Sequence, residues 1–110
     1  MATTTYKVLG QAAPSATTET DLYTVPASTQ TIVSTIVVAN RAATSATYRI
    51  SVSVAGAATA TKDYLIYDAT LAANSTTALT LGITLGATDK VRVYSSSANL
   101  SFNAFGSELA

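Results

Sequence analysis

Apolar side chains recur at every second position through much of this 110-residue chain, and no other feature constrains the fold as strongly. From Tyr48 to Val54, apolar residues alternate with Arg49, Ser51 and Ser53. Successive side chains of a β-strand point to opposite faces, so this period predicts strands with one buried and one solvent-facing side. No segment shows a convincing helical period. The alternation therefore predicts an all-β protein.

Turn-forming residues divide the alternating segments at short intervals. The segment 31–39 becomes apolar on both faces towards its end, as expected of a central strand. Seven or eight short strands predict an antiparallel β-sandwich, for which we expect an immunoglobulin-like Greek key, with a jelly roll as the alternative. The expected strands lie near residues 5–10, 20–25, 30–39, 46–54, 62–68, 76–85, 89–95 and 99–106.

The first 19 residues differ in character from the remainder. A polar segment of small residues, interrupted by Pro14, follows the first strand. We therefore predict an N-terminal strand or arm with its linker at 1–19 and a β-sandwich domain at 20–110. The first strand is either an edge strand of the sandwich or an arm that adds to the sheet of a partner. The residues that an arm would bring to a partner are Tyr6, Lys7, Leu9 and Gln11.

Charge is scarce and balanced, with 6 basic and 6 acidic residues and a net charge of zero. The basic residues are scattered singly, so we expect neither a nucleic-acid partner, which requires clustered cations, nor a membrane partner. About half of the chain is Ala, Thr and Ser. Such short side chains lose little conformational entropy when another surface covers them. The composition favours a protein that works by contact with macromolecules.

The sequence provides little catalytic equipment. The chain has no His and no Cys, which removes the usual base and nucleophile of hydrolases and the commonest zinc ligands. Asp63 and Asp68 flank one predicted strand at roughly 16 Å, too far apart for paired acid–base work. We therefore expect no enzyme, cofactor or metal. Tyr64 and Tyr67 should lie on opposite faces of that strand, and an exposed one could stack on a sugar or anchor a protein.

The N-terminal segment lacks the apolar core of a signal peptide, and the apolar runs are too short to cross a bilayer. We therefore expect synthesis in the cytoplasm without export by a cleaved signal.

Five segments together resemble small virion structural proteins of tailed bacteriophages: YKVLGQ (6–11), DLYTVP (21–26), TIVSTIVVAN (31–40), DKVRVYS (89–95) and NLSFNAFG (99–106). The resemblance spans nearly the whole chain. It implies an immunoglobulin-like domain bound to the virion after synthesis in the host cytoplasm, with the major capsid protein or another virion protein as partner. It brings no catalytic residues.

The resulting expectation is a capsid decoration, or cement, protein that ties neighbouring capsid subunits together. Two alternatives stay open. The chain could belong to a tail, neck or fibre, or it could be a carbohydrate- or cell-surface-binding module that uses Tyr64 or Tyr67. A homo-oligomer is compatible with each of them.

Overall fold

Extended strands make up most of the protein, as the alternation predicts. A computed structural model describes residues 2–110 and contains, in that range, nine strands and the 3-10 helices η1 (Val54–Gly56) and η2 (Thr61–Asp63). The strands are β1 (Thr4–Ala12), β2 (Thr20–Thr24), β3 (Gln30–Asn40), β4 (Ala46–Ser53), β5 (Tyr64–Leu71), β6 (Thr76–Leu79), β7 (Ile83–Leu85), β8 (Lys90–Ser95) and β9 (Leu100–Leu109). The all-β class is confirmed.

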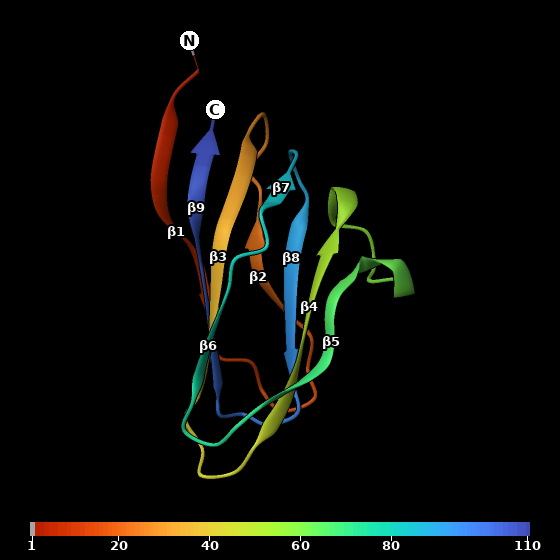
Figure 1. Cartoon of the computed structure of the whole chain (residues 1–110). Coiled ribbons are helices and arrows are strands. Elements are labelled where there is room, and N and C mark those ends of the chain that lie inside the picture. Colours follow the sequence, from red (N-terminus) through yellow and green to blue (C-terminus); the bar gives the residue numbers. More distant parts are fainter. Residues whose placement is uncertain (1) are drawn as a thin grey trace.

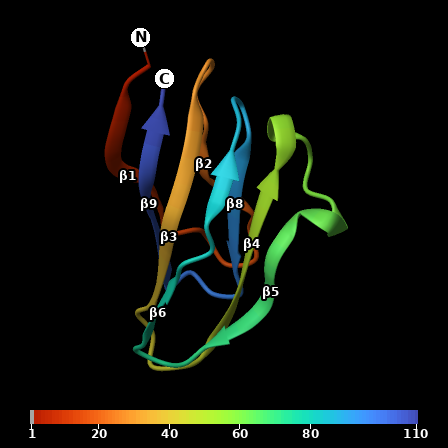
Figure 2. The ribbon, with the colours of Figure 1, turned by 45° about the horizontal axis from the view of Figure 1, so that its top comes forward.

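The strands form two antiparallel sheets (Figures 1 and 2). The first sheet has the order β1-β9-β3-β6, and β7 also pairs with β3. The second sheet has the order β2-β8-β4-β5. Figure 1 shows β1 and β5 at opposite sides of the molecule, with both chain ends near the same end of the sandwich. The expected antiparallel β-sandwich is therefore confirmed.

The pairing pattern distinguishes the two sandwich topologies. If β6 and β7 count as halves of one strand, the first strand pairs with the last, the second with the seventh, the third with the sixth and the fourth with the fifth. A ribbon of paired strands rolled in this way is a jelly roll. In an immunoglobulin-like sandwich the first strand lies beside the second. The strand order is thus that of the jelly roll, and the preference for the immunoglobulin-like order is corrected.

One expected strand, at 76–85, is divided into two. β6 pairs with Ile36–Ala39 of β3, and β7 pairs with Thr31–Val33 of the same strand. Between them Gly82 has a φ of 63°, in the left-handed region that glycine adopts without strain. The chain leaves the ladder there, so Leu81 is exposed instead of continuing the alternation.

The core lies between the sheets and consists of the inward-facing residue of each alternating pair. Val33, Ile36 and Val38 of β3 are fully buried. A register shift between Val33 and Thr35 keeps the apolar side chains of both halves of β3 directed into the core. Phe102 of β9 meets Tyr48 of β4 edge to face, with ring centroids 6.2 Å apart, so an aromatic pair joins the two sheets.

β1 belongs to the first sheet as its edge strand. It pairs with β9 from Thr4 to Ala12, with a register shift between Val8 and Gly10, and it buries Leu9 in the core. At Gly10 the backbone passes so close to β2 that an added Cβ would collide with the carbonyl of Leu22. Residue 1 lies outside the described residues. The division of the chain into an N-terminal unit at 1–19 and a sandwich domain at 20–110 stays a proposal.

Candidate interaction surface

The two sheets differ sharply in charge. The strands of the second sheet contain five charged residues, whereas those of the first sheet contain only Lys7 and Glu108. The ammonium of Lys7 lies 3.3 Å from the Glu108 carboxylate, and Glu108 also accepts a hydrogen bond from Tyr23 of β2. Because this pair turns towards the opposite sheet, the outward side chains of the first sheet are uncharged.

Large apolar side chains gather on that uncharged face. The register places Tyr6 and Ile32 on either side of Ser107, and it places Val8 next to Phe105. A shallow groove is lined by Tyr6, Ile32 and Phe105 together. We call the exposed apolar residues of these three strands the outer patch, and their exposed fractions are 84% for Tyr6, 47% for Val8, 52% for Ile32, 37% for Phe105 and 41% for Leu109.

Exposed apolar groups that lie together on a soluble surface are typical of contact sites for other macromolecules. Aromatic residues are enriched in such contacts because they cover a large area at little conformational cost. Tyr6 extends almost completely into solvent, so another surface can cover it without disturbing the core. The outer patch is therefore the candidate interaction surface.

The four N-terminal residues predicted to bind a partner occupy different environments. Tyr6 belongs to the outer patch, and Lys7 is paired with Glu108. Gln11 donates a hydrogen bond to the amide oxygen of Asn103 at 2.8 Å. Leu9 packs in the core, because it is the extra residue at the β1 register shift. Leu9 therefore offers no surface to a partner, and its inclusion among the predicted partner-binding residues is corrected.

Tyr64 and Tyr67 lie side by side instead of on opposite faces. Their rings meet edge to face with centroids 4.8 Å apart. Two register shifts along β5 cause this difference, since a bulge resets the alternation of side chains. The guanidinium of Arg49 lies over the Tyr67 ring at 4.3 Å and forms a 2.7 Å ion pair with Asp68.

The Arg49 guanidinium also lies 4.3 Å from the centre of the Tyr94 ring, so it is held between two tyrosines. One face of Tyr67 is consequently occupied within the molecule. A second groove, lined by Thr59–Thr61 and both β5 tyrosines, lies beside this cluster. The cluster mainly holds β4, β5 and β8 together. The groove is the accessible surface that remains for the carbohydrate-binding alternative.

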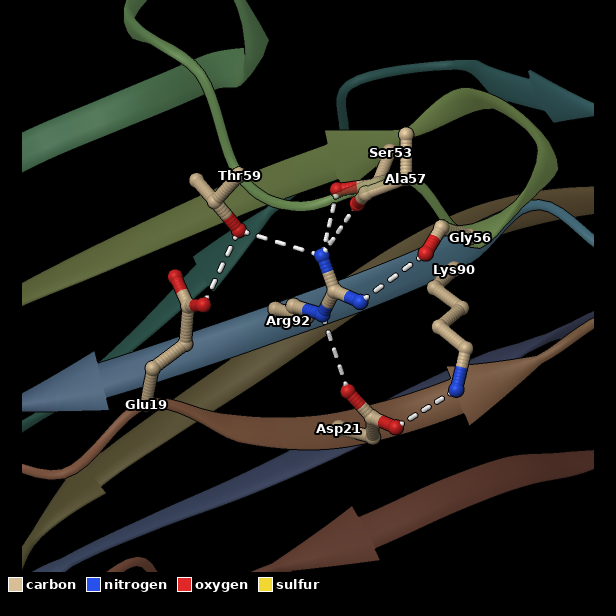
Figure 3. A network of polar contacts seen from close by, with 8 residues as sticks. All are labelled: Glu19, Asp21, Ser53, Gly56, Ala57, Thr59, Lys90 and Arg92. Atoms are coloured by element: carbon tan, nitrogen blue, oxygen red, sulfur yellow. Dashed lines mark hydrogen bonds and ion pairs between the residues drawn. The ribbon is translucent and has the colours of Figure 1, made fainter.

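Arg92 anchors the loop that borders this second groove (Figure 3). Its guanidinium donates hydrogen bonds to the carbonyls of Gly56 and Ala57, at 3.2 and 2.6 Å, and to the hydroxyls of Ser53 and Thr59. It also pairs with Asp21 of β2 at 3.0 Å. Thr59 in turn donates to Glu19.

The Asp21 carboxylate also accepts a 2.8 Å hydrogen bond from the Lys90 ammonium. The hydrogen bond from Lys90, with that from Arg92, lowers the pKa of Asp21 despite the desolvation of the carboxyl. The charges of the second sheet thus satisfy one another and order a loop.

The polar contact between Lys7, Glu108 and Tyr23 links the two sheets. The Tyr23 hydroxyl also bonds to the buried hydroxyl of Thr31 at 2.9 Å. Burial raises the pKa of Tyr23 to about 12, and the hydrogen bond to Glu108 acts in the same direction. That hydrogen bond is also the main cause of the lowered pKa of Glu108. This arrangement holds β1, β9, β2 and β3 together.

Residues 2–110 contain no cluster of three or more metal-ligating side chains. Over the same range, no helix has the length and hydropathy needed to cross a bilayer.

Comparison with known proteins supports the fold. No family model matches the sequence, and no curated protein matches it significantly. Among solved structures, a chain of infectious bursal disease virus, Gx strain, matches with a TM-score of 0.58 and 13% identity over 99% of this chain and 32% of that chain. A chain of the T13 viral particle of the same virus matches with 0.55 and 10% over 99% and 30%.

A chain of the Gt strain gives a TM-score of 0.52 at 9% identity, over 98% of this chain and 31% of the matched one. The protein therefore spans about a third of the length of each of these chains. At such low identities the similarity establishes a shared fold. By class, the protein is a jelly-roll sandwich of a kind that also occurs in chains of virus particles.

Of the outer patch, the residues predicted from the sequence include Tyr6 but not Val8, Ile32, Phe105 or Leu109. The alternation predicts one buried and one solvent-facing side for each strand, and it does not reveal which apolar residues lie together on the solvent-facing side. The signal was nevertheless present. The segment 31–39 becomes apolar on both faces towards its end, and the segments that form the first sheet carry almost no charge. A sheet with two apolar faces and no covering helix implies an exposed apolar surface.

Proposed function

We propose that this protein is a structural component of a virus particle, and specifically a capsid decoration protein that binds the major capsid lattice through the outer patch. The observation that carries the proposal is the uncharged, partly apolar outer face of the first sheet. The jelly-roll fold shared with chains of a virus particle supports the proposal, as does the resemblance of five segments to virion proteins of tailed bacteriophages.

The mechanism is adhesion. A copy seated across two neighbouring capsid subunits adds contact area to their junction, and this opposes separation of the subunits under internal pressure. Each copy can bind modestly when it reaches two subunits, because the second contact is made at high effective concentration. A neutral face rich in small side chains suits this role, since it carries few charges that lose hydration on contact.

A matched pair of substitutions tests the surface. Ile32 and Leu65 are similarly exposed, at 52% and 47%, but they lie on opposite sheets. Ile32→Glu should abolish rebinding of purified protein to particles stripped of it, because it buries a charge in the contact. Leu65→Glu should rebind like the unmodified protein. Equal binding of both variants would contradict the proposed surface, provided that circular dichroism shows both to be folded.

Copy number distinguishes decoration from the tail, neck or fibre alternative. Quantitative mass spectrometry of purified particles should give copies on the scale of the major capsid protein. A handful of copies per particle would favour the tail. Binding to a glycan array that is lost in Tyr64→Ala would favour the carbohydrate-binding alternative, for which the groove beside Tyr64 and Tyr67 is the specific observation.

A further inference from the structure

The free edge of β1 is the most exposed hydrogen-bonding edge of the sandwich. The first sheet ends at β1 on one side, and the register of β1 with β9 is unbroken from Thr4 to Val8. The other edges are shorter or interrupted: β2 and β5 carry register shifts, and β6 and β7 have four and three residues. A long, regular edge presents unpaired backbone groups to another strand.

The hydrogen-bond parity shows which groups are free. Thr3 and Ala110 exchange both backbone bonds, at 2.6 and 3.0 Å. In an antiparallel pair such exchanges recur at every second residue, so Thr5 and Lys7 face β9 in the same way. The N–H and C=O groups of the alternate residues, Thr4, Tyr6 and Val8, therefore point to the open side.

Two boundaries define this free segment. The register shift after Val8 ends the regular part of the strand, and at Gly10 β1 packs against Leu22 of β2. The free segment thus extends from Thr4 to Val8, and Tyr6 is its centre. It contains no proline, and its one charge, on Lys7, is already paired with Glu108. These are the devices by which edge strands usually avoid pairing, and here they are absent or neutralised.

We propose that two copies of this chain pair antiparallel through β1, about a two-fold axis at Tyr6. This register places Tyr6 opposite Tyr6 of the second copy, and Thr4 opposite Val8. It satisfies the free backbone groups of all three residues in both copies at once. On the other face Lys7 lies opposite Thr5, so no like charges meet directly.

Charge and continuity favour a second copy over an unrelated strand. The chain has no net charge, so two copies do not repel each other. The two-fold axis leaves both outer faces on the same side, and the two outer patches join through Tyr6 and Val8. The dimer therefore presents one continuous face. This inference does not depend on the proposed capsid role, because it concerns the purified protein alone.

A backbone test separates this pairing from a side-chain contact. The N–H of Tyr6 is not used by β9, so Tyr6→Pro should remove the outward donor while keeping the β1–β9 ladder. Tyr6→Ala removes the same side chain but keeps the N–H. In sedimentation velocity over a concentration series, Tyr6→Pro should weaken dimerisation at least about tenfold relative to Tyr6→Ala. A protein that stays monomeric at every concentration would overturn the proposal, and so would a Tyr6→Pro dimer as strong as that of Tyr6→Ala.

Cross-linking provides a second readout that does not rely on a proline variant. Opposed residues of a hydrogen-bonded antiparallel pair have Cα atoms about 5.5 Å apart, within the range that a disulfide spans. Because the chain has no cysteine, Tyr6→Cys introduces a single thiol. Mild oxidation should link it into a covalent dimer rapidly, whereas the exposed control Val54→Cys should not link. Equal rates for both variants would contradict the pairing.

Discussion

At the scale of single residues, polar side chains join β2 to β8 and β4 to β5 within the second sheet. The Tyr23–Glu108 contact joins the two sheets. Arg92 acts through the number and geometry of its donors, which a lysine cannot reproduce. Gly10 acts through the absence of a side chain. Neither role is visible in the alternation, because it depends on which strand lies next to which.

Gly10→Ala should destabilise the protein by roughly 1–3 kcal/mol, since the new methyl group would collide with the carbonyl of Leu22 and push β1 away from β2. Gly86→Ala is the matched control. A Cβ there would meet Asp89 at an ordinary 3.7 Å, and we expect a change in stability within about 0.5 kcal/mol. Urea denaturation of both variants measures this. Equal stability of the two variants would contradict the close packing of β1 on β2.

Stability should be highest at intermediate pH. The lowered pKa values of Glu108 and Asp21 mean that their contribution is present above their ordinary values of 4.5 and 3.8 and is lost as the pH falls through the folded pKa. Tyr23 has the opposite sign. Its contribution is complete below 10.0 and is lost as the pH rises towards about 12.

The melting temperature should therefore fall on both sides of a plateau. Tyr23→Phe should reduce the alkaline loss without eliminating it, because burial also raises the pKa of Tyr48. Differential scanning calorimetry across the pH range measures both limbs. A melting temperature that rises above pH 10 would show that Tyr23 is not held in its neutral form by the fold.

At the scale of elements, β1 is the strand that matters most for both the stability of the sandwich and its proposed contacts. It contributes Leu9 to the core and pairs with β9 from Phe102 to Leu109. In its outer half it also contributes Tyr6 and Val8 to the outer patch. The same strand therefore links the stability of the sandwich to its proposed contacts.

Deletion of residues 1–12 should lower the stability by roughly 3 kcal/mol or more, because burial of Leu9 alone contributes about 2 kcal/mol and β9 loses a neighbouring strand. Thermal melting followed by circular dichroism tests this, with removal of residues 1–2 as the control. A truncated protein that melts like the full chain would show that these residues are an arm outside the cooperative fold.

The positions of the strands were accessible from the sequence, whereas their partners were not. Alternation and turn residues locate β3, β4, β8 and β9 to within a few residues, because both depend on local chemistry. The choice of jelly roll over immunoglobulin-like order depends on long-range pairing between β1 and β9, which no local pattern encodes. The positions of Tyr64 and Tyr67 were wrong for a related reason, since the bulges of β5 shift the alternation.

At the scale of the whole molecule, the sandwich is elongated, with extents of 49 × 27 × 20 Å, and its two broad faces differ in chemistry. The face of the second sheet carries charges that pair internally and order the loop after η1. The face of the first sheet is uncharged and bears the outer patch. A molecule of this shape can lie flat on a larger assembly with one face covered and the other in solvent.

The most direct measurement is a cryo-EM reconstruction of the intact particle that contains this protein. We predict density for the sandwich repeated over the capsid lattice, with Ile32 and Phe105 of the first sheet facing the shell and Arg49 facing solvent. Particles whose lattice lacks the protein, or on which the second sheet faces the shell, would contradict the account.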